Sequence, residues 1–264
     1  MSPPERIALV TGAARGIGAA TVHAFAQAGW RVLAVDRAAD DPRLPYALGS
    51  SEQLRALEQA GRPGQVVAVA LDATDSQGLS RAIAGVERSS GGIDAVVAAA
   101  GVIAGGVPLW EMPEREQQAV LDGNLLAALS TARAGVPALL RRAIPREGRF
   151  IALASTAASR GMPMLAAYCA AKAAITGMVR ALALELRGTG VTANAISPGS
   201  TATPILDESA RLYQLQSAEQ FASQQPIGRL LAPQEIASAI LWLASPAGAG
   251  ITGADLPVDG GLAL

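Results

Sequence analysis

Short runs of apolar residues recur along the chain and alternate with longer segments whose apolar positions lie three or four residues apart. Short apolar runs bounded by turn residues are typical of buried strands, and a spacing of three and four is typical of helices. Alternating strands and helices predict a parallel sheet with helices on both faces. The predicted strands cover residues 7–10, 31–35, 65–71, 93–99, 149–154, 191–196 and 255–258.

Helical patterns follow most of these strands. The predicted helices cover residues 19–28, 51–60, 77–89, 114–142, 165–186 and 233–243. Residues 200–226 combine weak periodicity with mixed polar and bulky side chains, which predicts a mobile substrate lid. The chain shows no internal repeat or linker. We therefore predict an α/β fold, a doubly wound parallel sheet of about seven strands in a single domain of residues 1–264.

Composition narrows the classes of function. The 264 residues carry a net charge of −1, which gives no electrostatic reason to expect nucleic acid or an anionic membrane as partner. The chain has one cysteine, which excludes an intrachain disulfide. Because it also has only one histidine, we expect no metal site. The uncharged run at residues 95–110 is shorter than the ~20 apolar residues of a membrane span. The N-terminus does not resemble a signal peptide, so we expect a cytoplasmic protein.

Glycines cluster directly after the first predicted strand, in the order Thr11-Gly12-Ala13-Ala14-Arg15-Gly16-Ile17-Gly18. A strand, a glycine-rich turn and a helix in that order are the context that a dinucleotide site requires. The glycines let the backbone approach a pyrophosphate, and the helix N-terminus offers free N–H groups. We therefore predict a dinucleotide site at this turn.

An acidic residue ends the second predicted strand. Asp36 lies about twenty residues beyond the glycines, where a carboxylate can bond the ribose hydroxyls of NAD and repel the extra phosphate of NADP. Asp36 therefore favours NAD. Arg15 and Arg37 would attract that phosphate, which leaves an NADP-dependent carbonyl reductase open as an alternative. The alternative interpretation of Asp36 is a helix cap.

A long connector, residues 38–51, follows Asp36 and contains two prolines, two adjacent aspartates and Tyr46. It is long for a strand-to-helix loop. It would lie beside the adenine half of the predicted site, so one interpretation is that it covers the cofactor. The other is a mobile surface insert.

A tyrosine and a lysine stand four residues apart in the predicted helix 165–186. Tyr168 and Lys172 would lie on one helical face, and Lys172 is the single lysine of the chain. A neighbouring ammonium favours the phenolate and lowers the pKa of the tyrosine, which would make Tyr168 a general base near neutral pH. The alternative is a buried tyrosine beside a surface lysine.

Other candidate residues stand at the carboxyl ends of predicted strands, where open parallel sheets bind their ligands. The glycine turn, Asp36, Asp72, Gly101 and Ser155 all fall at such ends. Asn124 lies inside a predicted helix, where asparagine is unfavourable unless its amide has a partner. Its alternative interpretation is a solvent-facing polar residue.

Together these residues resemble the short-chain dehydrogenase/reductase family over essentially the whole chain. The matching positions are the cofactor turn Gly12-x-x-x-Gly16-x-Gly18, the adenine-side Asp72, the helix Asn124, Ser155, Tyr168-x-x-x-Lys172, and the nicotinamide-side loop Pro198-Gly199 with Thr201. One departure is Ala99-Ala100-Gly101, where the family usually has Asn-Ala-Gly. The loss of that asparagine puts sheet stability in question more than chemistry.

The resemblance implies a Rossmann-like fold and an NAD-dependent enzyme that oxidises an alcohol or reduces a ketone. It implies that Ser155, Tyr168, Lys172 and Asn124 are catalytic and that the protein forms a homotetramer. The cofactor-binding residues that it implies are Gly12, Arg15, Gly16, Ile17, Gly18, Asp36, Arg37, Asp72, Ala73, Ala100, Gly101, Tyr168, Lys172, Pro198, Gly199 and Thr201.

The substrate is expected to be a neutral, hydrophobic secondary alcohol or ketone, because no basic residue clearly awaits an acid group. The candidate wall residues are Ile103, Trp110, Met162, Met164, Ile205, Leu206, Tyr213 and Phe221. Two alternatives are a sensor that binds NAD without chemistry, which would not need the intact catalytic set, and an epimerase or dehydratase, whose usual large C-terminal domain is missing.

The connector and residues 99–106 also resemble a narrower group, the mycofactocin-associated dehydrogenases of actinobacteria. In that group an extended loop is thought to hold NAD so tightly that the cofactor does not exchange. The resemblance implies a tightly bound NAD in this protein too.

Overall fold

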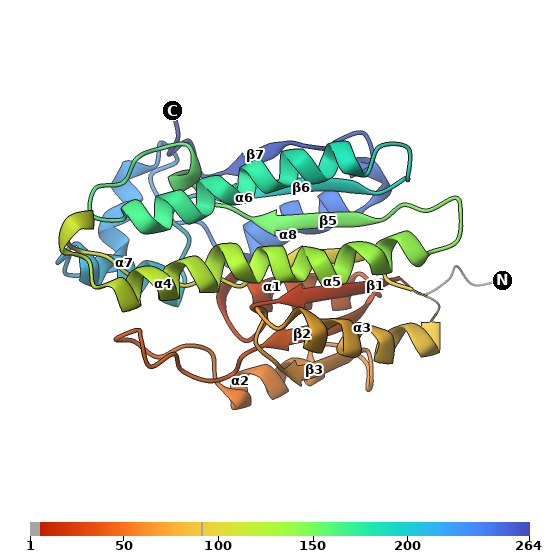
Figure 1. Ribbon diagram of the computed structural model, residues 1–264. Coiled ribbons are helices and arrows are strands. Elements are labelled where there is room, and N and C mark those ends of the chain that lie inside the picture. The colour runs from red at the N-terminus through yellow and green to blue at the C-terminus, as the bar shows by residue number, and fades with distance from the viewer. Residues whose placement is uncertain (1–5, 91) are drawn as a thin grey trace.

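A computed structural model describes residues 6–90 and 92–264 of the chain. Seven parallel strands form one sheet in the order β3-β2-β1-β4-β5-β6-β7. The strands are β1 (Ile7–Thr11), β2 (Arg31–Asp36), β3 (Val66–Ala70), β4 (Ala95–Ala98), β5 (Arg149–Leu153), β6 (Thr192–Pro198) and β7 (Asp255–Val258). Figure 1 shows helices in front of and behind this sheet, so the predicted doubly wound fold is confirmed.

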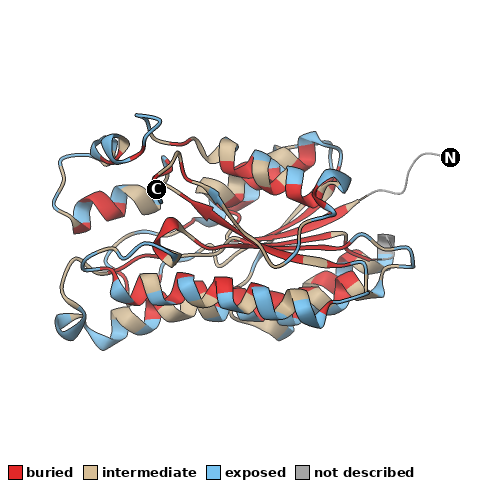
Figure 2. Ribbon diagram, turned by 90° about the horizontal axis from the view of Figure 1, so that it is seen from above, coloured by how far each residue is buried: buried red, intermediate tan, exposed pale blue. Residues whose placement is uncertain are grey.

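The helices form two layers. One face of the sheet carries α1 (Gly16–Gln27), α2 (Ser51–Ala56) and α8 (Pro233–Ala244), and the other carries α3 (Ser76–Ser90), α4 (Glu114–Leu121), α5 (Ala127–Arg141) and α6 (Ala166–Glu185). Alternate residues of a strand serve the two layers: in β1, Leu9 packs with the second group and Val10 with the first. Figure 2 shows the buried strands between helices whose outer faces are exposed.

The long helix expected at residues 114–142 is interrupted. A π-helical segment, Asp122–Leu126, separates α4 from α5 and contains Asn124. The Nδ2 of Asn124 donates to the backbone oxygens of Val120 and Val102, each at 2.8 Å. A π-turn adds one residue to the helical turn, and such turns are frequent at functional sites.

Residues 200–226 contain more regular structure than their weak periodicity indicates. They form α7 (Pro204–Leu212) and a 3₁₀ segment, Ala218–Gln224. The hydroxyl of Thr203 accepts from the backbone N of Leu206 at 3.4 Å at the start of α7. Figure 1 places α7 beyond the carboxyl ends of the central strands. The mobility of this segment as a lid stays a prediction.

Among the described residues, α6 is the helix that is long and apolar enough to cross a membrane by length and composition. It lies along the sheet in Figure 1 and supplies Ile175 and Val179 to the core, as a core helix does. In the same part of the chain no group of three His, Cys, Asp or Glu side chains could hold a metal ion.

The order in which the chain adds strands reverses between β1 and β4, which are neighbours in space but not in sequence. Gly12 follows β1 with a φ of +67°, and a Cβ there would lie 2.5 Å from the Cα of Ala100. Only glycine fits this close approach of the two strand ends. Such switch points are where doubly wound sheets bind ligands, so the fold puts the site at this edge.

Candidate active site

A cavity of about 530 Å³ opens at the carboxyl ends of the strands. Its volume lies within the roughly 300–1,000 Å³ typical of cofactor and substrate sites. The predicted residues that line it are Gly12, Arg15, Gly16, Ile17, Gly18, Asp36, Arg37, Asp72, Ala73, Ala100, Gly101, Ser155, Tyr168, Lys172, Pro198, Gly199 and Thr201. We call the part around Asp36 and Asp72 the adenosine end and the part around Tyr168 the catalytic end.

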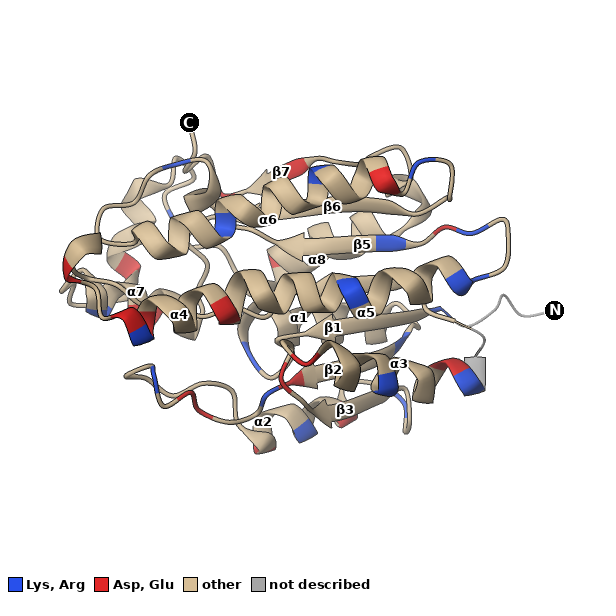
Figure 3. Cartoon of the chain, in the orientation of Figure 1, with Lys and Arg blue, Asp and Glu red and all other residues tan. Residues whose placement is uncertain are grey.

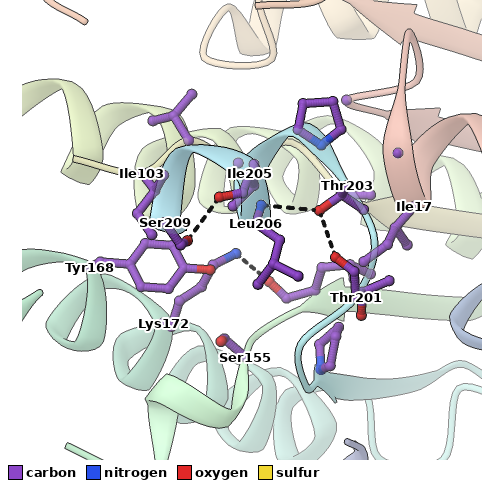
Figure 4. Close-up of a pocket in the computed structure, with 18 of the residues that line it drawn as sticks. Ile17, Ile103, Ser155, Tyr168, Lys172, Thr201, Thr203, Ile205, Leu206 and Ser209 are labelled. Carbon is purple, nitrogen blue, oxygen red and sulfur yellow. Dashed lines mark hydrogen bonds between the residues drawn. The ribbon is translucent and has the colours of Figure 1, made fainter. Parts of the chain in front are cut away.

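Ser155, Tyr168 and Lys172 meet at the catalytic end, facing α7 (Figure 4). Ser155 follows β5, and its Oγ accepts from the backbone N of Ala157 at 3.1 Å. On α6, the Nζ of Lys172 lies 5.7 Å from the centre of the Tyr168 ring. The same Nζ donates to the backbone oxygen of Leu153 at 2.8 Å. Lys172 is buried, so the alternative of a surface lysine is wrong.

Burial sets the charge states of this pair. It raises the pKa of Tyr168 to about 12, against the opposing effect of a hydrogen bond with Ser155. It also lowers the pKa of Lys172 to about 8. In the protein without cofactor the pKa of Tyr168 is therefore raised and not near neutral, because desolvation of the phenolate outweighs the hydrogen bond with Ser155.

Asn124 lies immediately behind the cavity wall and is fully buried, so the solvent-facing alternative is wrong. Its Oδ1 has no hydrogen-bond partner among the described residues. A Cβ on Gly101 would stand 3.0 Å from this oxygen and 3.5 Å from the Nζ of Lys172. The structure thus holds an unused acceptor and a buried amine beside the same face of Gly101.

Asp36 ends β2 and joins the glycine turn to the connector. Its Oδ2 accepts from the backbone N of Ala14 at 3.0 Å, and its Oδ1 accepts from the backbone N of Ala38 at 2.9 Å. Asp36 therefore caps no helix, and that alternative is wrong. Because each carboxylate oxygen has a second lone pair, the side chain can still accept from ribose hydroxyls in the cavity.

Arg37 at the adenosine end is held by two carboxylates. Its Nη1 lies 2.9 Å from Asp41 and its Nη2 lies 2.8 Å from Asp72. Both contacts raise the pKa of Arg37, against the effect of its burial. Asp72 is also held by the backbone N and the hydroxyl of Thr74, at 2.9 and 2.8 Å. The charge of Arg37 is thus compensated within the protein, which weakens its attraction for the extra phosphate of NADP.

The connector is tied to the rest of the protein at several points, which argues against a mobile insert. Asp41 is buried and lies 2.8 Å from Arg43, whose Nη1 bonds Asp122 at 2.7 Å. The Nη1 of Arg15 donates to the backbone oxygen of Ala47 at 2.8 Å. Leu48 and Gly49 line the cavity. Figure 3 shows acidic and basic segments side by side along this loop, between β2 and α2.

Most of the expected substrate wall lines the cavity: Ile103, Met162, Ile205, Leu206, Tyr213 and Phe221. Trp110 and Met164 do not, and those two predictions are wrong. Trp110 is 85% exposed on a 3₁₀ turn, Leu109–Glu111. Met164 is 37% exposed and has a φ of +60°, in a tight turn before α6.

Sequence reasoning missed a basic residue in the wall. Arg160 lines the cavity and is exposed, and its Nη1 donates to the backbone oxygen of Leu262 at 2.6 Å. The acidic residues of the lining, Asp36 and Asp72, belong to the adenosine end. Arg160 stands only five residues after Ser155, which could have indicated a place near the cavity. Its contact with the C-terminal segment is long-range, and no local pattern reveals such a contact.

Known proteins share this arrangement over nearly the whole chain. The family description "Enoyl-(Acyl carrier protein) reductase" matches residues 12–263. The short-chain reductase protein NovJ of Streptomyces niveus is 38% identical, over 97% of this chain and 94% of NovJ. The chain belongs to the short-chain dehydrogenase/reductase family.

Two further members differ in what their names state. Cis-4-hydroxycyclohexanecarboxylate dehydrogenase of Sinomonas cyclohexanicum is 34% identical to this short-chain dehydrogenase/reductase, over 97% of this chain and 96% of that one. The crystal structure of carveol dehydrogenase from Mycobacterium avium in complex with NAD has a TM-score of 0.91 and 28% identity, and the match covers 98% of both chains. Membership of the family identifies the protein as an oxidoreductase. The substrates named for its members differ.

Proposed function

We propose that this protein is an NAD-dependent oxidoreductase that oxidises a secondary alcohol to a ketone or catalyses the reverse reduction. The observation that carries the proposal is the meeting of Ser155, Tyr168 and Lys172 in one cavity with the glycine turn after β1. When bound, the nicotinamide supplies the acceptor or donor of the hydride. The carveol dehydrogenase named above, which binds NAD, supports the choice of cofactor.

In this mechanism Tyr168 exchanges a proton with the substrate oxygen, and Ser155 holds that oxygen by a hydrogen bond. Lys172 bonds the ribose on the nicotinamide side and supports the proton transfer. Asn124 takes part in a proton relay from Lys172, since its free Oδ1 and the Nζ lie beside the same face of Gly101. Burial raises the pKa of Tyr168 to about 12 in the protein without cofactor, and a positive charge bound beside the ring would favour the phenolate.

NAD fits the adenosine end better than NADP. Asp36 offers a carboxylate to ribose hydroxyls, and the charge of Arg37 is compensated by Asp41 and Asp72. The anchored connector with Leu48 and Gly49 in the wall fits a cofactor that is held tightly, as the resemblance to mycofactocin-associated dehydrogenases implies. Stoichiometric release of NAD or NADH from dialysed, denatured protein would support tight binding, and an empty site would point to free exchange.

The body of the substrate is apolar, because Ile103, Ile205, Leu206 and Phe221 line the catalytic end. The sequence-based expectation of a neutral substrate is weakened by Arg160, which favours a second candidate class, alcohols that carry a carboxylate. The relative that acts on a hydroxycyclohexanecarboxylate fits this second class. A screen of matched hydroxy acids and their methyl esters decides between them: esters turn over faster if the substrate is neutral, and acids if Arg160 binds it.

Three further points belong to the proposal. The intact Ser155, Tyr168 and Lys172 argue against a sensor that only binds NAD. We expect a homotetramer because the family resemblance implies one, and the exposed Ala166, Ala170 and Ala173 on α6 would permit close approach of another subunit. We expect the protein in the cytoplasm.

Replacement of Tyr168 by phenylalanine tests the proposed function. The variant keeps the buried ring but loses the hydroxyl that exchanges the proton. General acid–base catalysis contributes about 10²–10⁴-fold, so turnover should fall by at least about a hundredfold while NAD binding stays nearly intact. Turnover is followed by the absorbance of reduced nicotinamide, and NAD binding by calorimetry. Near-normal turnover of the variant would reject the proposed function.

A further inference from the structure

The connector contacts the peptide group that holds Asn124. The hydroxyl oxygen of Tyr46 accepts from the backbone N of Ile103 at 2.9 Å. The backbone oxygen of Val102, in the same peptide group, accepts from the Nδ2 of Asn124 at 2.8 Å. A peptide group is planar and rigid, so a bond at its N–H edge fixes the direction of its C=O edge. Tyr46 is thus linked to Asn124 through one rigid group.

A second contact from the connector reaches the same π-helical segment. The Nη1 of Arg43 bonds the Oδ2 of Asp122 at 2.7 Å, two residues before Asn124. The Nε and Nη2 of Arg43 bond both carboxylate oxygens of Asp41, at 2.9 and 2.8 Å. The Nη1 of Arg37 also donates to the Oδ2 of Asp41, at 2.9 Å. The π-helical segment is therefore fastened to the connector at its first residue.

These contacts determine where the free oxygen of Asn124 points. A primary amide has two N–H donors, and those of Asn124 are used by the backbone oxygens of Val102 and Val120. With both donors committed, the Oδ1 is left facing the space beside Gly101 that it shares with the Nζ of Lys172. A turn of the Val102–Ile103 peptide would release one donor and let the amide rotate.

We infer that Tyr46 and Arg43 are positioning residues, which hold the Oδ1 of Asn124 toward Lys172 and so connect the loop at the adenosine end to the proton relay. The inference deepens the proposed function and rests on it. It predicts that loss of the Tyr46 hydroxyl weakens proton relay without removing any group that contacts substrate or cofactor.

The single lysine of the chain allows a test that needs no substrate. Lysine labelled with ¹³C at Cε gives one signal, from Lys172, whose pH titration is followed by NMR in the intact protein. An acceptor beside an ammonium stabilises its charged form. In Asn124→Ala the pKa of Lys172 should therefore fall, by about half a unit or more, and in Tyr46→Phe it should fall in the same direction.

Coupling between the two positions is the decisive readout. In the double variant Tyr46→Phe/Asn124→Ala, the pKa of Lys172 should equal that of Asn124→Ala alone, because Tyr46 acts through Asn124. A Lys172 titration in Tyr46→Phe that matches the wild type would overturn the inference. So would single shifts that add fully in the double variant.

A second variant and a matched control guard against a general loss of structure. Arg43→Met should shift the Lys172 titration as Tyr46→Phe does. Arg141→Met removes an arginine that bonds Glu87 through two nitrogens, at 3.0 and 2.9 Å on the surface far along α5, and should leave the titration unchanged. A shift in Arg141→Met equal to that in Arg43→Met would contradict a specific role.

Turnover gives an independent measurement with any alcohol found in the screen, at saturating NAD. Tyr46→Phe should lower kcat about fivefold to tenfold, the effect of one lost hydrogen bond, with the KM for NAD unchanged. If kcat were unchanged and the KM for NAD rose instead, the connector would act on cofactor binding and the inference would fail. Failure of the proposed function is distinct, since it shows as an active Tyr168→Phe.

Discussion

The two ends of the cavity are held in place by different forces. At the catalytic end, Tyr168 and Lys172 are buried on α6, and the contact of the lysine is a backbone oxygen at 2.8 Å. At the adenosine end, the connector is held by a chain of charged side chains that runs from Asp72 through Arg37, Asp41 and Arg43 to Asp122. One end depends on packing in the core, and the other depends on ion pairs.

The difference has consequences for stability. The side chains of Arg37 and Arg43 are 28% and 31% exposed, so their pairs lie partly in water and are screened by salt. Buried apolar contacts at the catalytic end are insensitive to moderate salt. The connector should therefore be the part of the site that loosens first when charges are removed or screened.

The largest effect is expected from Asp41→Asn, which breaks the chain of ion pairs at its centre. Asp41 is 5% exposed and bonds both Arg37 and Arg43, and these pairs hold the pKa of its carboxyl far below the usual range. Loss of its charge leaves Arg37 paired with Asp72 alone and Arg43 paired with Asp122 alone. The variant should lower the free energy of unfolding by about 2 kcal/mol, less than for a fully buried pair. Urea denaturation with and without bound NAD measures the change.

A matched control for this variant is Glu147→Gln. Glu147 pairs with Arg6 at 3.8 Å on the surface, with side chains 58% and 40% exposed. Such a pair contributes about 0–1 kcal/mol, so the control should be close to the wild type. If Asp41→Asn were as stable as Glu147→Gln, the connector would not depend on its ion pairs.

An effect of similar size is expected from pH at the catalytic end. The pKa of Lys172 is lowered to about 8 from an ordinary 10.5, so between these values the unfolded chain binds one more proton than the folded protein. Stability should therefore rise with pH in this window, by about 2 kcal/mol. Thermal unfolding from pH 8 to 10 measures the rise. Lys172→Met should abolish the rise. A flat wild-type profile would show that the pKa of Lys172 is not lowered in the folded protein.

Prediction from sequence succeeded where contacts are local. The order of strands and helices, and the spacing of Tyr168 and Lys172 on one helical turn, follow from patterns within a few residues. The bonds of Tyr46 to Ile103 and of Arg43 to Asp122 join residues 57 and 79 positions apart. No pattern of apolar positions contains such pairings, so the role of the connector was left open.

The π-helical segment and the cavity wall show the same limit. Asn124 was expected inside one regular helix, because a π-turn leaves the apolar spacing of the sequence almost unchanged. Trp110 was expected among the mostly apolar wall residues, but its burial depends on distant segments, and these do not cover it. Arg160 was missed because its partner, Leu262, lies 102 positions away.

The smallest effect is expected from Trp110→Ala. The side chain is 85% exposed and does not line the cavity. The free energy of unfolding should therefore stay within about 0.5 kcal/mol of the wild type, and kcat and KM should be close to their wild-type values. Steady-state kinetics and urea denaturation check this. A large rise in the KM for the alcohol would mean that the residue closes over the substrate in the working enzyme.

Transfer of deuterium tests the central claim most directly. The wild-type protein is incubated with NAD and a panel of apolar secondary alcohols, with and without a carboxylate, each carrying deuterium on the carbinol carbon. We expect at least one alcohol to yield its ketone and reduced nicotinamide that contains the deuterium, as mass spectrometry of the cofactor would show. Binding of NAD without deuterium in the cofactor for any alcohol of the panel would contradict hydride transfer at this site.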